Sequence, residues 1–130
     1  MPRRTPGSDN RVLLVCRLLN RRRARYLITG GVAANLHGSV RATKDVDLLI
    51  PKDPANAKRV LDALGDLPRV DLLTAACTVT FEKAWPRRVV RRIGGIRVPY
   101  LSLSDLIRSK QTGRASDLAD IEVLSGRQET

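Results

Sequence analysis

Two aspartates, Asp45 and Asp47, lie two positions apart in the apolar stretch DVDLLI, residues 45–50. Strands normally avoid aspartate, and residues two apart in a strand share a face, so both carboxylates are expected to point the same way. At about 4 Å and an effective dielectric near 20, two like charges repel by roughly 4 kcal/mol. Such a pair is stable if water screens it, if one carboxyl is protonated, or if a cation bridges it. Lys44 and Arg41 could neutralise it by ion pairing, whereas hard oxygen ligands favour Mg²⁺ or Mn²⁺.

A third aspartate, Asp71, opens the later apolar stretch VDLL. If residues 45–50 and 70–74 form neighbouring strands, Asp71 joins the first two carboxylates. Three carboxylates around two divalent ions would orient an attacking oxygen and neutralise a triphosphate during an in-line displacement. The alternative is that Asp71 is only a solvent-facing residue at the start of a strand.

A glycine pair, Gly30 and Gly31, ends one apolar run and opens the next predicted helix. Without side chains, backbone N–H groups at such a turn can approach phosphate oxygens. The alternative is a tight strand-to-helix turn with no ligand. Neither GxxxxGK[ST] nor GxGxxG occurs there, so the two common phosphate loops are excluded.

The elements that must position these residues follow from periodicity and turn residues. Asp53 is the expected N-cap of a helix that starts at Pro54 and ends near Gly65, and Gly38 is expected to stop an earlier short helix. Gly94-Gly95 is the expected turn of a hairpin. The predicted order is helix (within 11–26), strand (25–31), helix (32–38), strand (44–51), helix (53–67), strand (69–75), hairpin (87–101) and two helices within 102–126. This order predicts an α/β (α+β) fold, a mixed β-sheet flanked by helices, with two short C-terminal helices punctuated by Gly113.

Composition restricts the class of protein. The chain has 130 residues, 42% of them apolar, and a formal charge of +11, which suits one domain (11–126) after a flexible basic tail (1–10) and a polyanionic partner. Aromatic residues make up only 3%, which argues against a base-stacking platform. Cys16 and Cys77 are expected to be buried free thiols, and a single histidine cannot build a zinc cluster. No apolar run is long enough for a membrane span and no secretion signal is present, so a cytoplasmic location without membrane contact is expected.

The glycine pair and the aspartates together have a specific order. Residues 28–48 read hydrophobic, polar, Gly-Gly, thirteen residues (32–44), then Asp-Val-Asp-Leu. This resembles the signature of the nucleotidyltransferase superfamily related to DNA polymerase β. The run GGVAANLHGSVRATKDVDLLI and the later LSLSDLIRSKQTGRASDLADIEVL are similar to small bacterial nucleotidyltransferase-fold proteins, some of them akin to type IV toxins of abortive-infection systems. The resemblance covers residues 12–125.

The resemblance implies a role for each matching residue. Gly30 and Gly31 would hold a nucleoside triphosphate, and the three aspartates (Asp45, Asp47 and Asp71) would be catalytic and bind two Mg²⁺ or Mn²⁺ ions. Lys110 matches a lysine directed at the nucleotide, and Arg41 and Lys44 are expected phosphate contacts. The implied reaction transfers a nucleoside monophosphate to a hydroxyl on protein, RNA or a small molecule. Larger members carry an extra acceptor-selecting domain, so acceptor recognition here would need a second copy or a partner protein.

Other conspicuous residues receive structural interpretations. His37 is expected to pack or cap its helix end, and Phe81 and Trp85 are expected in the core. Arg114, Asp117 and Asp120 are expected to hold the last two helices together, and this structural role is preferred over a chemical one. Two alternatives to the enzyme remain open: a toxin or antitoxin module that binds a partner, and a basic RNA-binding protein whose binding weakens with salt.

Overall fold

The computed structural model describes residues 8–40, 42–111 and 121–126. A five-stranded mixed sheet forms its centre, in the order β3-β2-β1-β7-β6, and a separate two-stranded sheet pairs β4 with β5. The elements are α1 (Ser8–Arg21), β1 (Leu27–Thr29), α2 (Gly30–Leu36), β2 (Val46–Leu49), α3 (Pro54–Leu64), β3 (Val70–Leu73), β4 (Ala75–Ala76), β5 (Val79–Thr80), α4 (Phe81–Ala84), the 3₁₀ turn η1 (Trp85–Arg87), β6 (Val89–Ile93), β7 (Ile96–Tyr100) and α5 (Leu103–Ser109). Residues 121–126 are also helical.

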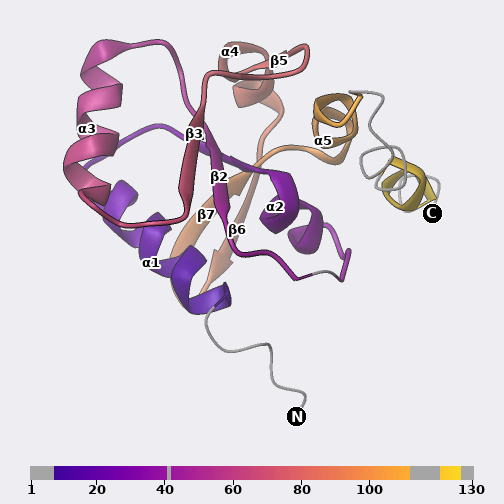
Figure 1. Ribbon diagram of the computed structural model, residues 1–130, viewed down its shortest axis with the longest axis horizontal. Helices are drawn as coiled ribbons and strands as arrows, with labels where there is room; N and C mark the ends of the chain where they lie inside the picture. The colour runs from indigo at the N-terminus through magenta and orange to yellow at the C-terminus, as the bar shows by residue number, and fades with distance from the viewer. Residues whose placement is uncertain (1–7, 41, 112–120, 127–130) are drawn as a thin grey trace.

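Helices cover both faces of the sheet (Figure 1). α1 packs against α3 and β7, whereas α2 packs against β2 and α5. β1 runs antiparallel to β2 and parallel to β7, β2 runs parallel to β3, and β6 and β7 form an antiparallel hairpin. The predicted fold class is therefore confirmed, including the mixed character of the sheet.

The helix start and the hairpin turn predicted from local sequence signals are present in the structure. The Asp53 side chain accepts a hydrogen bond from the backbone N–H of Ala55 at 3.1 Å, Pro54 is the first residue of α3, and Gly65 follows the helix with φ of 54°. Such a cap satisfies one of the otherwise unpaired N–H groups of the first turn. Gly94 and Gly95 have φ of 58° and 78°. Positive φ at both central residues suits a two-residue hairpin turn whose twist matches that of the flanking strands.

The core lies between the sheet and its helices. The central strands are buried on both sides, so β1 has no exposed residue and β2 exposes only part of Asp47. The largest fully buried side chains come from α1, the strands and the residues that flank them, α3, α5 and residue 124: Tyr26, Leu19, Leu27, Ile28, Leu48, Leu49, Leu101, Leu106, Leu124, Val15, Val60 and Val98. Phe81 is buried and Trp85 packs against the core, as expected.

The structure differs from the sequence-based expectations in three places. α1 begins at Ser8, so residues 8–10 belong to a helix and not to the tail; Ser, Asp and Asn are all common at helix starts. β4, β5 and α4 were not predicted, because two-residue strands leave no periodicity to detect. Cys77 is exposed at a turn, whereas Cys16 is buried and has a pKa raised to about 11 by burial.

Some expectations fall outside the described residues, Gly113 among them. Within the described part of the chain, no helix combines the length and apolar character that a membrane crossing requires.

Candidate active site

Strand pairing brings Asp47 and Asp71 side by side. β2 and β3 are parallel, and their register sets Asp47 directly opposite Asp71. On the other side of β2, Asp47 is opposite Thr29, the last residue of β1, which is followed at once by Gly30. Directly opposed residues project from the same face of a sheet, so the two carboxyl groups meet next to the β1–α2 turn.

The Asp47 carboxyl is in an unfavourable electrostatic environment. Its pKa is raised from the ordinary value of 3.8 to about 6, first by burial and then by a side-chain hydrogen bond with Asp71. That hydrogen bond requires a proton on one of the two carboxyl groups, because two ionised carboxylates have no donor. The negative charges of Asp71 and Asp45 raise the Asp47 pKa further, and the charge of Lys110 lowers it. A half-buried acid held in this way favours any cation that replaces the proton.

Asp45 contributes to this environment from a different position. It precedes the first strand residue, Val46, and its side chain is exposed, while its carbonyl oxygen accepts a hydrogen bond from Thr43 Oγ1 at 3.1 Å. Among the described residues, no three His, Cys, Asp or Glu side chains gather closely enough to hold a metal ion by themselves. The site is therefore a close pair, Asp47 and Asp71, with Asp45 at the strand entrance, near enough for its charge to raise the Asp47 pKa.

Gly30 makes room for the Asp47 carboxyl. Its φ is +68°, a left-handed conformation that side chains disfavour, and a Cβ added there would overlap Asp47 Oδ2. A Cβ on Gly31 would lie 3.1 Å from Thr43 Oγ1, which is also tight. The glycine pair thus allows the α2 backbone to approach the acidic pair, whatever else it binds.

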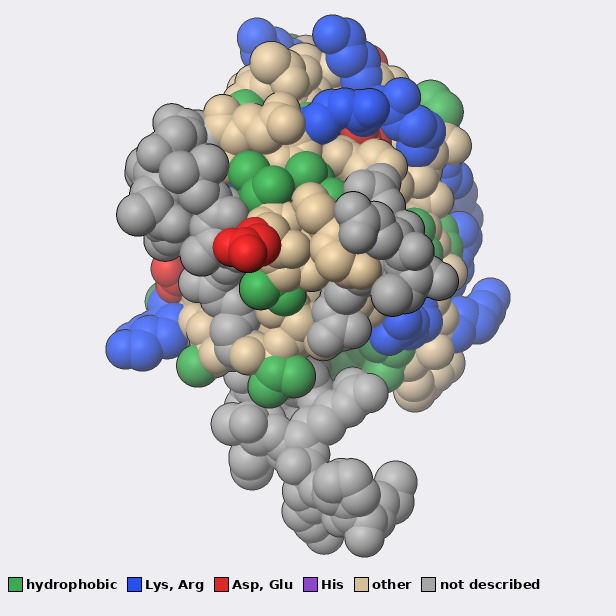
Figure 2. Space-filling model, turned by 90° about the vertical axis from the view of Figure 1, so that its right-hand side faces the viewer, with side chains coloured by type: hydrophobic (Ala, Val, Ile, Leu, Met, Phe, Trp, Pro, Cys, Tyr) green, Lys and Arg blue, Asp and Glu red, His purple; other side chains and the backbone are tan. Residues whose placement is uncertain are grey.

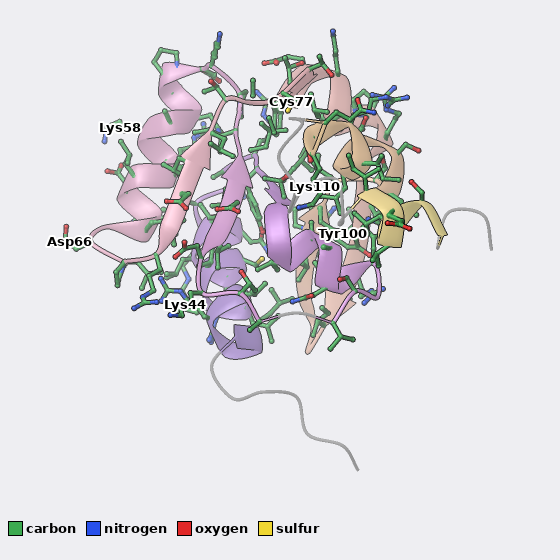
Figure 3. All side chains as sticks on the ribbon, turned by 45° about the vertical axis from the view of Figure 1, so that its right-hand side comes forward. Lys44, Lys58, Asp66, Cys77, Tyr100 and Lys110 are labelled. Carbon is green, nitrogen blue, oxygen red and sulfur yellow. The ribbon has the colours of Figure 1, made fainter. Side chains whose placement is uncertain are left out.

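Lys110 supplies the positive charge beside Asp47. It directly follows α5, its residue is only 8% exposed, and its charge lowers the pKa of Asp47. Figure 3 shows Lys110 near the centre of the molecule and Lys44 toward the lower edge. Lys44 is exposed, and no ion pair within the described residues joins it to Asp45 or Asp47, so the ion-pairing alternative receives no support from Lys44.

A buried ion network holds α5, the helix that directly precedes Lys110, and no sequence pattern indicates this network. Asp105 is fully buried and accepts two hydrogen bonds from Arg87, at 2.9 and 3.2 Å, and a third from Arg108 at 2.9 Å. Its backbone N–H donates to Ser102 Oγ, which caps α5. The Ser-x-x-Asp spacing of the cap is readable from the sequence, but the pairing with Arg87 across the fold is not.

Of the remaining candidates from the sequence, His37 has a structural role, and the others lie outside the residues that the structure describes. His37 follows α2, its Nε2 lies 2.8 Å from the carbonyl oxygen of Leu101, and its ring meets Tyr100 edge-on at 5.1 Å. This position gives His37 the packing role that was expected. Arg41, Arg114, Asp117 and Asp120 lie outside the described residues.

The donor set of the pair fits a hard divalent cation. Mg²⁺ is usually held by one or two carboxylates, with water and substrate phosphates completing its shell. Asp47 and Asp71 offer two carboxyl groups from adjacent strands, and the missing side chain of Gly30 leaves room for the Asp47 carboxyl beside the β1–α2 turn. The absence of a full protein cage is compatible with such an ion.

The arrangement of sheet and helices defines the fold as nucleotidyltransferase-like. The supporting match is the crystal structure of an antigenic nucleotidyltransferase-like protein from Paracoccidioides brasiliensis, with 20% identity, a TM-score of 0.62, and coverage of 90% of this chain and 76% of that one. At this identity the likeness establishes the fold alone. No protein-family model matches the sequence, and neither does any curated protein.

Proposed function

We propose that this chain is a metal-dependent nucleotidyltransferase that moves a nucleoside monophosphate from a nucleoside triphosphate to a hydroxyl group. The observation that carries the proposal is the pair of opposed carboxyl groups, Asp47 and Asp71, on adjacent strands beside the Gly30 turn, in a fold of the nucleotidyltransferase type. A structural role does not account for a pair that raises the Asp47 pKa to about 6, because it destabilises the fold at neutral pH.

Each residue of the site has a defined task in this reaction. Asp47 and Asp71 would hold Mg²⁺ or Mn²⁺, two ions in the form that the resemblance implies, with Asp45 completing the acidic surface. When bound, such ions neutralise the triphosphate and activate the acceptor oxygen. The Lys110 ammonium, held beside Asp47, would bind a phosphate oxygen, and the Gly30-Gly31 backbone admits the triphosphate close to the carboxylates.

The finer assignments are part of the proposal and come from the sequence resemblance. They are an ATP-like donor, an acceptor on protein, RNA or a small molecule, a homodimer or a partner protein, a place in a toxin–antitoxin system and a cytoplasmic location. Lys44 and Arg41, which precede β2 in the sequence, would contact phosphate.

Labelled ATP, CTP, GTP and UTP, each with Mg²⁺ and candidate hydroxyl acceptors, test the proposal. We expect transfer by the wild-type chain, and a loss of about 1,000-fold in Asp47→Asn and Asp71→Asn, because each substitution removes a charged ligand oxygen. Asp66→Asn is the matched control: Asp66 is exposed, and Figure 3 shows it at the far side of the molecule from Lys110.

Triphosphate binding with and without Mg²⁺, measured on the same variants, separates binding from chemistry. Circular dichroism checks that each variant is folded. The proposal fails if the wild-type chain neither binds triphosphate nor transfers nucleotide, or if both site variants behave like Asp66→Asn.

A further inference from the structure

A surface hollow lies away from the acidic pair, between the end of α1 and the β6–β7 hairpin. Its volume is about 380 Å³, and its lining includes three arginines (Arg23, Arg88 and Arg97) together with Asn20 and Trp85. α1 packs on the β7 face opposite α2, so this hollow and the Asp47 site open on different faces of the sheet. It is as large as the smaller ligand pockets of proteins.

The arginines around this hollow form no ion pair with an acid of the described residues. Arg92 is directly opposite Arg97 in the hairpin, so their side chains share one face, and like charges in such a pair destabilise a sheet. Within the part of the chain that the structure describes, no carboxylate forms an ion pair with Arg23, Arg88, Arg92 or Arg97. Four guanidinium groups gathered without an acid create a surface that favours an external polyanion.

Part of this surface is pre-organised. The Arg88 guanidinium lies 3.8 Å from the centre of the Trp85 ring and donates a hydrogen bond to the Trp85 carbonyl oxygen at 2.9 Å. The Asn20 amide donates to the Arg97 carbonyl oxygen at 3.0 Å and accepts from the Tyr26 hydroxyl at 2.8 Å. These contacts fix the hairpin to the end of α1, so binding would order few additional side chains.

We propose that this hollow and the adjacent hairpin face bind the phosphodiester backbone of a single-stranded nucleic acid. The guanidiniums extend beyond the hollow along the hairpin, which suits several consecutive phosphates better than one. The Trp85 ring is already stacked with Phe81 at 5.0 Å and covered by Arg88, so recognition is of phosphate and not of base. Figure 2, a view from the α5 side, shows Lys and Arg side chains at the upper rim and along both edges, with few in the middle of this face.

The test is fluorescence anisotropy of a labelled twelve-nucleotide RNA between 50 and 300 mM KCl. Replacing two phosphate contacts, in the variant Arg92→Gln plus Arg97→Gln, is expected to reduce the salt slope by about 1.4 and the affinity at 0.1 M salt by about 25-fold. The matched control, Lys52→Gln plus Arg59→Gln, removes the same charge from exposed positions beside and on α3, and its slope should be unchanged. Arg92→Gln alone should show about half of the change, which keeps the test valid if the double variant unfolds.

Three outcomes overturn the inference: no strand binding by the wild-type chain, equal weakening in the two double variants, or displacement of the strand by equimolar tripolyphosphate. Binding of a DNA strand of the same sequence shows whether the site prefers RNA or DNA. Similar affinities, or a preference for either strand, support the proposed site. Asp47→Asn should bind the strand normally, so failure of nucleotide transfer and failure of strand binding are separate results.

Discussion

Asp47 and Asp105 are two partly or fully buried acids whose surroundings are opposite. Asp105 is fully buried, and its oxygens accept three hydrogen bonds from Arg87 and Arg108. Asp47 is half-buried beside Asp71 and Asp45, and among the described residues Lys110 is the neighbour whose charge favours its ionised form. Within residues 8–40, 42–111 and 121–126, two arginines pair with Asp105 and none pairs with Asp47.

This difference distinguishes Asp105, a structural carboxylate, from Asp47, a candidate metal-binding carboxylate. A buried charge is tolerable when it is paired and hydrogen-bonded, as at Asp105. An acid that lacks such partners reduces the stability of the folded state when it ionises, and that loss is recovered when a cation binds. The contrast predicts that substitutions at the two sites change stability in opposite directions.

The largest expected change in stability is at Asp105. Asp105→Ala should lower the free energy of unfolding by about 3 kcal/mol, because two arginines lose their shared acceptor and α5 loses its anchor; half-exposed guanidiniums keep the loss at the low end of the range for broken buried pairs. Thermal unfolding measures it, with a fall in Tm of roughly 10 °C. Asp62→Ala, at an exposed pair with Lys58, is the control and should leave Tm nearly unchanged. A small effect at Asp105 would remove the contrast between the two acids.

Gly30 tests how closely the backbone approaches Asp47. Gly30→Ala should destabilise the chain by about 2 kcal/mol, because the new methyl group combines a left-handed backbone with overlap of the Asp47 carboxyl. Gly94→Ala is a matched control, since Gly94 has φ of +58° but open space around it, and about 1 kcal/mol is expected there. Denaturant unfolding of both variants gives the difference. Equal losses would mean that the Asp47 carboxyl moves aside freely.

Asp47→Asn should stabilise the chain at neutral pH. The folded-state pKa of about 6 lies above the ordinary 3.8, so the folded state binds the extra proton and stability falls as pH rises from about 4 to about 6. After allowance for the exposed half of the side chain, the variant should gain about 1 kcal/mol, or roughly 3 °C in Tm, at pH 7.5. The gain should vanish near pH 4 in metal-free buffer. A variant less stable than the wild-type chain at pH 7.5 would contradict the electrostatic assignment.

Lys110→Met should produce the smallest change and sharpen the assignment. Loss of the Lys110 charge removes the interaction that lowers the Asp47 pKa, so the Asp47 titration midpoint should move to higher pH. Carboxyl-carbon NMR of the metal-free chain measures this midpoint directly. Lys52→Met, at an exposed position, should leave it unchanged, and an unchanged midpoint in Lys110→Met would place the lysine outside the site.

Much of the fold could be predicted because its signals are local. The Asp53–Pro54 helix start, the Gly94-Gly95 turn and the apolar runs of β1, β2 and β3 each depend on a few consecutive residues. β4 and β5 are too short for such a signal, and α1 extends three residues beyond the predicted start.

The candidate site was only partly predictable. Strand alternation and adjacency correctly bring Asp47 and Asp71 together, since register follows from the apolar faces of two strands. Alternation could not show that Asp45, lying before the first paired residue, stays exposed. It also could not reveal the Arg87–Asp105–Arg108 network, because side-chain pairing between distant segments leaves no periodic trace.

The position of β3 at the edge of the sheet limits the lifetime of the contact between Asp47 and Asp71. β2 is held by a neighbour on each side, but β3 is paired with β2 alone, and three of its four residues are exposed. Strands with few buried contacts detach from their sheets by local opening well below the free energy of global unfolding. Each such opening would carry Asp71 away from Asp47 and leave the rest of the domain folded, so the lifetime of the pair is a property of one edge strand.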